Sequence, residues 1–268
     1  MKQHEAILQY AALGEPLDSL LIVDVHGHLG AAGGFDNPVR QPEELLAVMD
    51  RIGVEAVCVS HLLSLNGDYH LGNDLVADAV RRFPGRFLGY AVANPNRPEE
   101  IQAELDRCCH DLAMRAIKVH ADFQGYPIDG EGYRRMYEYS QANGGLPVLG
   151  HGLSAAATAR LAADYPSVPF IVAHSGGGYQ GRFLDDIIGL AIRADNVYLD
   201  LCSSLAYFGA LEVLVRQVGA EKLLFGSDLS YQQMTHAIGR ILFARISDAD
   251  KELILGLNAA RLFRLTRS

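Results

Sequence analysis

The sequence lacks several features that would assign it to a class at once. Its 268 residues contain four cysteines, with no CxxC pair and no disulfide-dense spacing. A disulfide scaffold is therefore excluded, and reduced thiols in a cytoplasm are expected. No apolar run reaches the roughly 18 residues that a membrane span needs, and the N-terminus lacks the apolar core of a signal peptide.

Positive charge is also scarce. The chain has 23 Lys and Arg against 32 Asp and Glu, a formal net charge of 23 − 32 = −9. This balance argues against nucleic acid or an anionic membrane as the main partner. Half of the residues, 49%, are hydrophobic, which is typical of a globular protein with a large core. We therefore expect a cytoplasmic protein that acts on a small molecule.

One pattern repeats along the chain: short apolar runs alternate with longer segments of helical period. Strands that are apolar throughout are typical of a parallel sheet covered by helices. Pro42 and Pro98, each followed by two glutamates, are expected helix starts. The predicted helices include residues 42–52, 73–83, 98–112, 133–142 and 206–218. The predicted strands are residues 20–28, 56–62, 87–95, 116–123, 146–152, 169–177, 196–204 and 223–229.

Eight strand–helix units without a linker favour a single-domain (β/α)₈ TIM barrel spanning residues 1–268. The alternative is an open doubly wound sheet, but such a sheet usually has a glycine-rich phosphate loop after its first strand. Neither GxGxxG nor GxxxxGK[ST] occurs here. Residues 1–19 are expected to pack across the barrel bottom or on a neighbouring subunit, and residues 248–265 to form a closing helix.

Histidines gather where the predicted strands end. In a TIM barrel the carboxyl ends of the strands surround one pocket. Asp228 ends the eighth strand, and the histidines at strand ends are His26, His28, His61, His120, His151 and His174. This clustering is the strongest functional signal in the sequence.

The spacing of His26 and His28 favours a metal site. Residues two apart in a strand point to the same face, about 7 Å apart along the backbone. Two neutral imidazoles aimed at one point suit a divalent cation, and His151 with Asp228 can complete a three-nitrogen, one-oxygen set. Such ligands suit zinc best, although manganese or iron would also fit.

The chain resembles the amidohydrolase superfamily, in its amidohydrolase 2 branch. The matching stretches, between residues 20 and 265, are DVHGH, IKVH, VLGHG, FIVAHSGGG, NVYLDLCSS, LLFGSDLS and ILGLNAARLFRL. The resemblance implies a distorted TIM barrel with one metal at its mouth.

The resemblance also assigns roles to particular residues. It implies that His26, His28, His151 and Asp228 bind the metal, that Asp228 also handles the proton of an attacking water, and that His174 polarises the substrate. In some superfamily members a carbamylated lysine bridges two metals, and Lys118 sits in a similar place, two residues before His120. A second metal, held by Lys118 and His174, is therefore an open alternative.

The expected substrate contacts are fewer. His120 follows the fourth strand and is interpreted as a contact to substrate or as a support for a metal ligand. Arg182 and Tyr179 follow a run of glycines after the sixth strand. A guanidinium at a helix start could hold a carboxylate, and aromatic residues at a barrel mouth suit a cyclic substrate.

Three functions are compatible with this site. The first is hydrolysis, in which a metal-activated water cleaves a C–N or C–O bond (amide, lactone or ester) of a small carboxylated compound. The second is metal-dependent decarboxylation of an aromatic or unsaturated acid. The third is a binding barrel without catalysis, which the complete set of site residues argues against. Because the loops are short, a neighbouring subunit of a homo-oligomer could complete the pocket.

Overall fold

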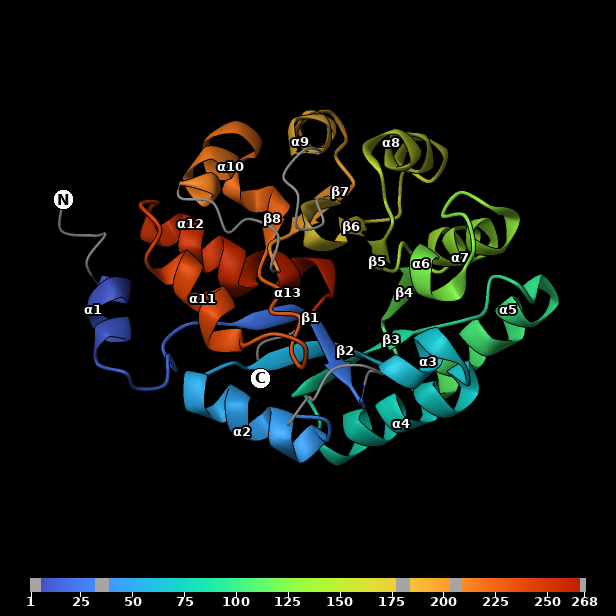
Figure 1. Ribbon diagram of the computed structural model, residues 1–268, viewed down its shortest axis with the longest axis horizontal. Coiled ribbons are helices and arrows are strands. Elements are labelled where there is room, and N and C mark those ends of the chain that lie inside the picture. Colours follow the sequence, from blue (N-terminus) through green and yellow to red (C-terminus); the bar gives the residue numbers. More distant parts are fainter. Residues whose placement is uncertain (1–5, 32–38, 177–183, 203–208, 266–268) are drawn as a thin grey trace.

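The computed structural model describes residues 6–31, 39–176, 184–202 and 209–265. Within them, eight parallel strands form one sheet in which each strand pairs with the next along the chain. Helices surround the strands (Figure 1). The sequence prediction of a (β/α)₈ TIM barrel is confirmed. The strands are β1 (Val23–Leu29), β2 (Ala56–His61), β3 (Phe87–Ala91), β4 (Ala116–His120), β5 (Val148–His151), β6 (Phe170–Val172), β7 (Val197–Asp200) and β8 (Leu223–Leu224).

Helices follow the strands around the barrel, and none in the described parts of the chain is long and apolar enough to cross a membrane. The α-helices are α1 (Ala6–Ala12), α2 (Pro42–Ile52), α3 (Leu62–Asn66), α4 (Tyr69–Arg82), α5 (Pro98–Asp106), α6 (Ala121–Gln124), α7 (Glu131–Ala142), α8 (Ala155–Asp164), α9 (Leu184–Arg193), α10 (Ala210–Val218), α11 (Met234–Leu242), α12 (Asp248–Glu252) and α13 (Asn258–Leu262). Short 3-10 or π segments are η1 (Arg107–Asp111), η2 (Ala173–Gly176), η3 (Ala220–Lys222) and η4 (Leu253–Leu257).

Local sequence explains where α2 begins and ends. Pro42 occupies the first turn, and the side chain of Glu44 accepts a hydrogen bond from the backbone N–H of Gln41 at 2.8 Å. Gly53 ends the helix in the left-handed conformation, at φ 89°, which glycine adopts without steric cost. The predicted helix over residues 42–52 is therefore confirmed at both ends.

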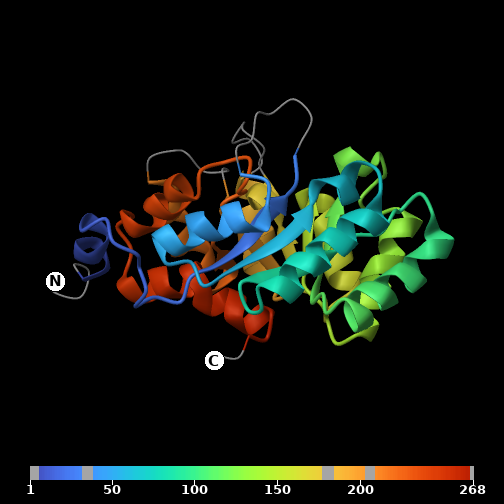
Figure 2. The ribbon, with the colours of Figure 1, turned by 90° about the horizontal axis from the view of Figure 1, so that it is seen from below.

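The interior of the barrel is filled by alternate residues of the strands. At its base, Ala259 and Phe263 of the C-terminal segment pack against this interior. Figure 2 shows α13 at the end of the barrel opposite to the one where β1 ends. The base is thereby filled, and the open end is left for a site. The strand residues of the interior are Val23, Val25, Ala56, Cys58, Tyr90, Ala116, Leu149, Ile171 and Leu224, and Ala173 of η2 joins them.

The N-terminal segment lies on the outside of the helical ring. Helix α1 contacts α11, and the buried side chain of Ile7 joins the outer core. The backbone N–H of Leu17 donates to the carbonyl oxygen of Ile52, where α2 ends, at 2.8 Å.

Strand β1 carries an irregularity that aims its histidines into the barrel. Asp24 pairs with Val57 and Gly27 with Val59, so β1 has one residue more than β2 between these pairs. Such a bulge changes which face a side chain points to. Gly27 faces outward, because a Cβ placed there would lie 2.5 Å from Cγ1 of Val57. His26 and His28, on either side of it, point inward.

The eighth strand is shorter than the predicted residues 223–229. Beyond Leu224 the chain joins β1 through separate backbone bonds: Val25 N donates to Phe225 O at 2.9 Å, and Asp228 N donates to His26 O at 2.8 Å. Asp228 has a left-handed backbone, with φ 60°, which cannot continue a strand. The sixth strand ends early for the same reason, since His174 has φ 53°. Both departures from regular structure occur at residues that the sequence predicts for the site.

Candidate metal centre

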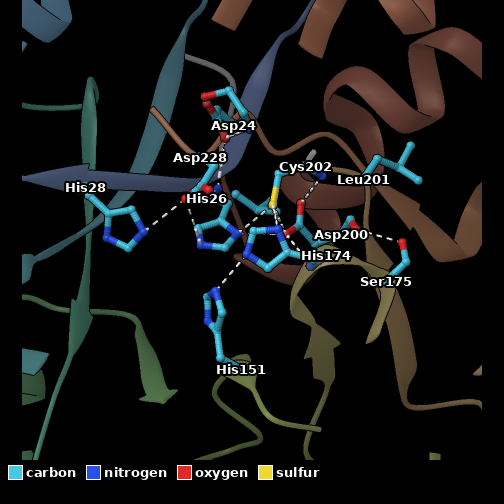
Figure 3. Close-up of polar contacts among 12 residues, drawn as sticks. Asp24, His26, His28, His151, His174, Ser175, Asp200, Leu201, Cys202 and Asp228 are labelled. Atoms are coloured by element: carbon cyan, nitrogen blue, oxygen red, sulfur yellow. Dashed lines mark hydrogen bonds and ion pairs between the residues drawn. The ribbon is translucent and has the colours of Figure 1, made fainter. Parts of the chain in front are cut away.

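The predicted strand-end residues meet at the open end of the barrel. His26 and His28 come from β1, His151 ends β5, His174 lies in η2 after β6, and Asp228 follows β8. Figure 3 shows the four imidazoles and the carboxylate pointing toward one another. Side chains that are up to about 200 residues apart in sequence thus form one cluster.

Asp228 lies beside both histidines of β1. Its Oδ1 is 3.3 Å from Nε2 of His28 and 3.7 Å from Nε2 of His26. Ligand atoms of these three residues all lie within 4.8 Å of one another. The three side chains that the sequence predicts from the first and last strands are therefore close enough to share one cation.

His151 lies in a second group, with His26 and His174, whose ligand atoms also lie within 4.8 Å of one another. The Nε2 atoms of His151 and His174 are 2.8 Å apart. Nδ1 of His151 is buried without a hydrogen-bond partner among the residues described. Because a buried polar atom is rarely left unpaired, this nitrogen and the close imidazole pair fit a centre that holds a cation.

Burial sets the protonation of this cluster. Burial, together with the charge of Lys118, lowers the pKa of His26 to about 4. Burial also lowers the pKa of His28 and that of His151. Burial opposes ionisation of Asp228, but the hydrogen bond with His28 outweighs it, so the pKa of this carboxyl lies below its usual range. Neutral imidazoles and an ionised carboxylate are the forms that bind metals.

Lys118 reaches the same centre from β4. Its side chain is fully buried, and Nζ lies 2.9 Å from Nε2 of His26. Burial lowers the pKa of this amine to about 8, although the charge of Asp228 acts in the opposite direction.

His120 lies at the edge of the cluster as the middle ring of a stack. Its ring lies 4.1 Å from that of His151, at an interplanar angle of 5°, and 4.1 Å from that of Phe123, at 14°. Nδ1 of His120 accepts a hydrogen bond from the backbone N–H of Phe123 at 3.3 Å. A nitrogen that accepts from a backbone N–H carries no proton, so the neutral ring presents N–H at Nε2.

Two predicted substrate residues, Tyr179 and Arg182, lie outside the residues that the structure describes. Their assignments remain predictions.

Sequence reasoning missed the residues that support the histidines from behind, foremost Asp200. Its Oδ2 accepts hydrogen bonds from Nδ1 of His26 at 2.7 Å and from the backbone N–H of His174 at 3.2 Å. Carboxylates in this position orient metal-binding imidazoles. Asp200 ends β7, so the strand-end rule that selected the histidines also applies to it.

Asp24 supports the centre in a different way, by joining its first and last strands. Its carboxylate accepts hydrogen bonds from the backbone N–H of His26 at 2.9 Å and of Ser227 at 3.0 Å, and another from the Ser227 hydroxyl. The side chain is fully buried. Asp24 therefore holds together the two backbone segments that carry His26 and Asp228.

A TIM barrel with histidines and an aspartate at its open end defines a class of metal-dependent enzymes. The model of one such family, Amidohydrolase (Amidohydro_2), matches residues 23–265. The chain belongs to this amidohydrolase family, as its sequence motifs indicate.

Curated relatives include a gamma-resorcylate decarboxylase of Polaromonas sp., which is 22% identical over 84% of this chain and 84% of its own. A 2-keto-4-carboxy-3-hexenedioate hydratase of Sphingobium sp. is 26% identical over 59% of this chain and 57% of its own.

Solved structures share the fold. The 2,6-dihydroxybenzoate decarboxylase from Rhizobium has a TM-score of 0.71 at 19% identity, covering 91% of this chain and 99% of its own. The 5-carboxyvanillate decarboxylase from Novosphingobium aromaticivorans, in complex with manganese and a nitrobenzoic acid, has a TM-score of 0.76 at 16% identity. That comparison covers 94% of this chain and 99% of the solved one.

Proposed function

We propose that this protein is a metal-dependent decarboxylase of an aromatic or unsaturated carboxylic acid. The observation that carries the proposal is the match to a curated decarboxylase along 84% of both chains. The cluster of histidines and Asp228 at the barrel mouth supports it. Hydrolysis, which the sequence alone favours, is the weaker alternative, because the curated relatives that match along more than two thirds of the chain are decarboxylases.

We assign His26, His28, His151 and Asp228 as the ligands of one divalent metal. Nitrogen and carboxylate ligands accept zinc, manganese or iron. The sequence favours zinc, but manganese is the better supported metal, since it is bound in related solved decarboxylases. When bound, the metal would act as a Lewis acid that holds the carboxylate of the substrate.

The remaining residues of the centre would bind the substrate and transfer the proton. Decarboxylation breaks the bond between the ring carbon and the carboxylate: CO₂ leaves, and the electron pair stays on the ring carbon, which takes up a proton. Asp228 and His174 face the centre and are the groups we assign to pass that proton from solvent to carbon. The buried ammonium of Lys118 would lie beside the substrate carboxylate and balance its charge.

Two residues at the mouth fit an aromatic substrate. Phe123 is 45% exposed and stacks on His120, so it offers an open ring face. The Nε2–H of His120 would donate to an oxygen of the substrate. The neutral ring of His120 and the ammonium of Lys118 would thus bind different parts of one oxygenated acid.

The test is a search for the products. The manganese-loaded protein is incubated with 2,6-dihydroxybenzoate and with 5-carboxyvanillate, with a hydrolysable lactone and an amide in parallel. We expect release of one CO₂ per molecule of acid consumed, and no ¹⁸O from labelled water in the aromatic product. The His26→Ala protein should release no CO₂. Cleavage of the lactone or amide, with water incorporated and no CO₂ released, would instead establish the hydrolase.

A further inference from the structure

The thiol of Cys202 lies behind the centre, two residues after β7, and is fully buried. Its Sγ donates a hydrogen bond to Oδ2 of Asp200 at 2.8 Å. It also lies 3.1 Å from Nδ1 of His26 and 3.1 Å from Nδ1 of His174. Figure 3 shows the sulfur between the two imidazoles and the carboxylate. The proposed reaction assigns no role to this side chain.

The direction of each of these hydrogen bonds can be assigned by counting the available protons. An ionised carboxylate only accepts hydrogen bonds, so Nδ1 of His26, at 2.7 Å from Oδ2 of Asp200, must be the donor. The thiol has one hydrogen and gives it to the same oxygen. With its hydrogen directed at Asp200, the sulfur is an acceptor toward Nδ1 of His174 at 3.1 Å, and we take this nitrogen as the donor.

We propose that Cys202 is a positioning residue that sets the tautomer of His174. His174 Nδ1–H donates to the sulfur, the thiol donates to Asp200, and Nε2 of His174 is left with a lone pair directed at Nε2 of His151. Asp200 sets the same tautomer directly for His26. Both imidazoles thereby present lone pairs to the centre, as a metal ligand or a proton acceptor requires.

The first measurement needs neither metal nor substrate. In the metal-free protein labelled with ¹⁵N-histidine, long-range ¹H–¹⁵N spectra distinguish a proton on Nδ1 from one on Nε2. We expect His174 to carry its proton on Nδ1 in the wild type and in Cys202→Ser, whose hydroxyl can also accept and donate. In Cys202→Ala the Nδ1–H signal should be lost. A wild-type His174 that carries its proton on Nε2 would overturn the proposal, whichever variants fold.

The second measurement is the affinity for Mn²⁺, determined from the electron paramagnetic resonance signal of the free ion. We expect Cys202→Ala to weaken binding about 10–100-fold, the usual effect of removing a supporting contact, and Cys202→Ser to bind within a few-fold of wild type. Cys58→Ala is the matched control, because Cys58 is an equally buried thiol of the barrel interior and should leave the affinity unchanged.

Two results would contradict this role. Equal losses in Cys202→Ala and Cys58→Ala would mean that only packing matters. A sulfur-to-metal charge-transfer band in the Co²⁺-loaded wild type, absent from Cys202→Ala, would mean that the sulfur is itself a ligand. The inference concerns the centre and does not depend on which reaction it catalyses, so failure to release CO₂ would leave it standing.

Discussion

Nζ of Lys118 lies 2.9 Å from Nε2 of His26, and both side chains are fully buried. The nitrogen that we assign to the metal is therefore the hydrogen-bond acceptor of a buried amine. A metal that takes this lone pair leaves Lys118 without that acceptor. A buried cation needs a new partner, and a substrate carboxylate would provide one.

Replacing Lys118 separates the one-metal and two-metal interpretations. In the Lys118→Met protein we expect about one equivalent of metal by elemental mass spectrometry, as in the wild type, because the ligand set that we propose does not include the lysine. KM for the acid should rise about 10–100-fold, the loss expected when a hydrogen bond to a charged group worth about 1.5–3 kcal/mol is removed. Two equivalents in the wild type and fewer in Lys118→Met would establish the bridging lysine.

Removal of a ligand should abolish metal binding and leave the fold intact. We expect His26→Ala and Asp228→Ala to fold but to bind no manganese. Adding manganese at 100 times its Kd should stabilise the wild type by about 2.7 kcal/mol and leave both variants unchanged in thermal melts. His236→Ala is the control, since this exposed histidine lies on α11, outside the cluster. Equal stabilisation of all four proteins would refute the ligand assignment.

Gly27→Ala tests whether the bulge of β1 positions the ligands. The added Cβ would meet Cγ1 of Val57 at 2.5 Å, and overpacking of this kind costs about 1–3 kcal/mol. We expect a lower free energy of unfolding in urea and weaker manganese binding. The double variant Gly27→Ala/Val57→Ala makes room for the methyl group and should recover the affinity relative to Val57→Ala. An unchanged affinity in Gly27→Ala would mean that the bulge does not control the site.

Glu104 should make the free energy of unfolding depend on pH in the acidic range. Burial opposes its ionisation, but hydrogen bonds from Arg107 and Asn73 outweigh it and hold the pKa of this carboxyl below its usual range. Its contribution is therefore present above about pH 4.3, the value for an unfolded chain, and is lost as the pH falls through the folded value.

In Glu104→Gln we expect a loss of about 1.5–3 kcal/mol at pH 7 and a flatter fall of Tm between pH 5 and 3, measured by circular dichroism. Glu55→Gln, a change at an exposed carboxyl, serves as the control. A Tm that falls equally steeply in Glu104→Gln and the wild type would exclude this linkage.

Much of the fold could be predicted because the strands of a parallel sheet covered by helices are apolar throughout, so each of them is visible in the sequence as an apolar run. The order of the strands and the meeting of His28 with Asp228 follow from that pattern. The bulge could not be predicted, because it depends on how β1 pairs with β2. The left-handed backbone of Asp228 has no sequence signal either, since it is imposed by the junction with β1.

Asp200 and Cys202 escaped prediction for a different reason. A short side chain that faces the back of an imidazole looks like any polar residue at a strand end until the ring orientations are known. The positions of the ligands are thus readable from one sequence, whereas their supports depend on three-dimensional geometry.

The backbone bonds between β1 and the segment after β8 imply an order in which the parts of the centre come together during synthesis. During synthesis His26 and His28 emerge about 200 residues before Asp228, whose backbone N–H then bonds to His26 O. The filling of the base by α13 comes later still. A chain that has not yet reached Asp228 therefore holds the histidines but lacks the carboxylate of the proposed ligand set. With the ligand set that we propose, the centre can be completed only after Asp228 has been synthesised, which makes it one of the last parts of the barrel to assemble.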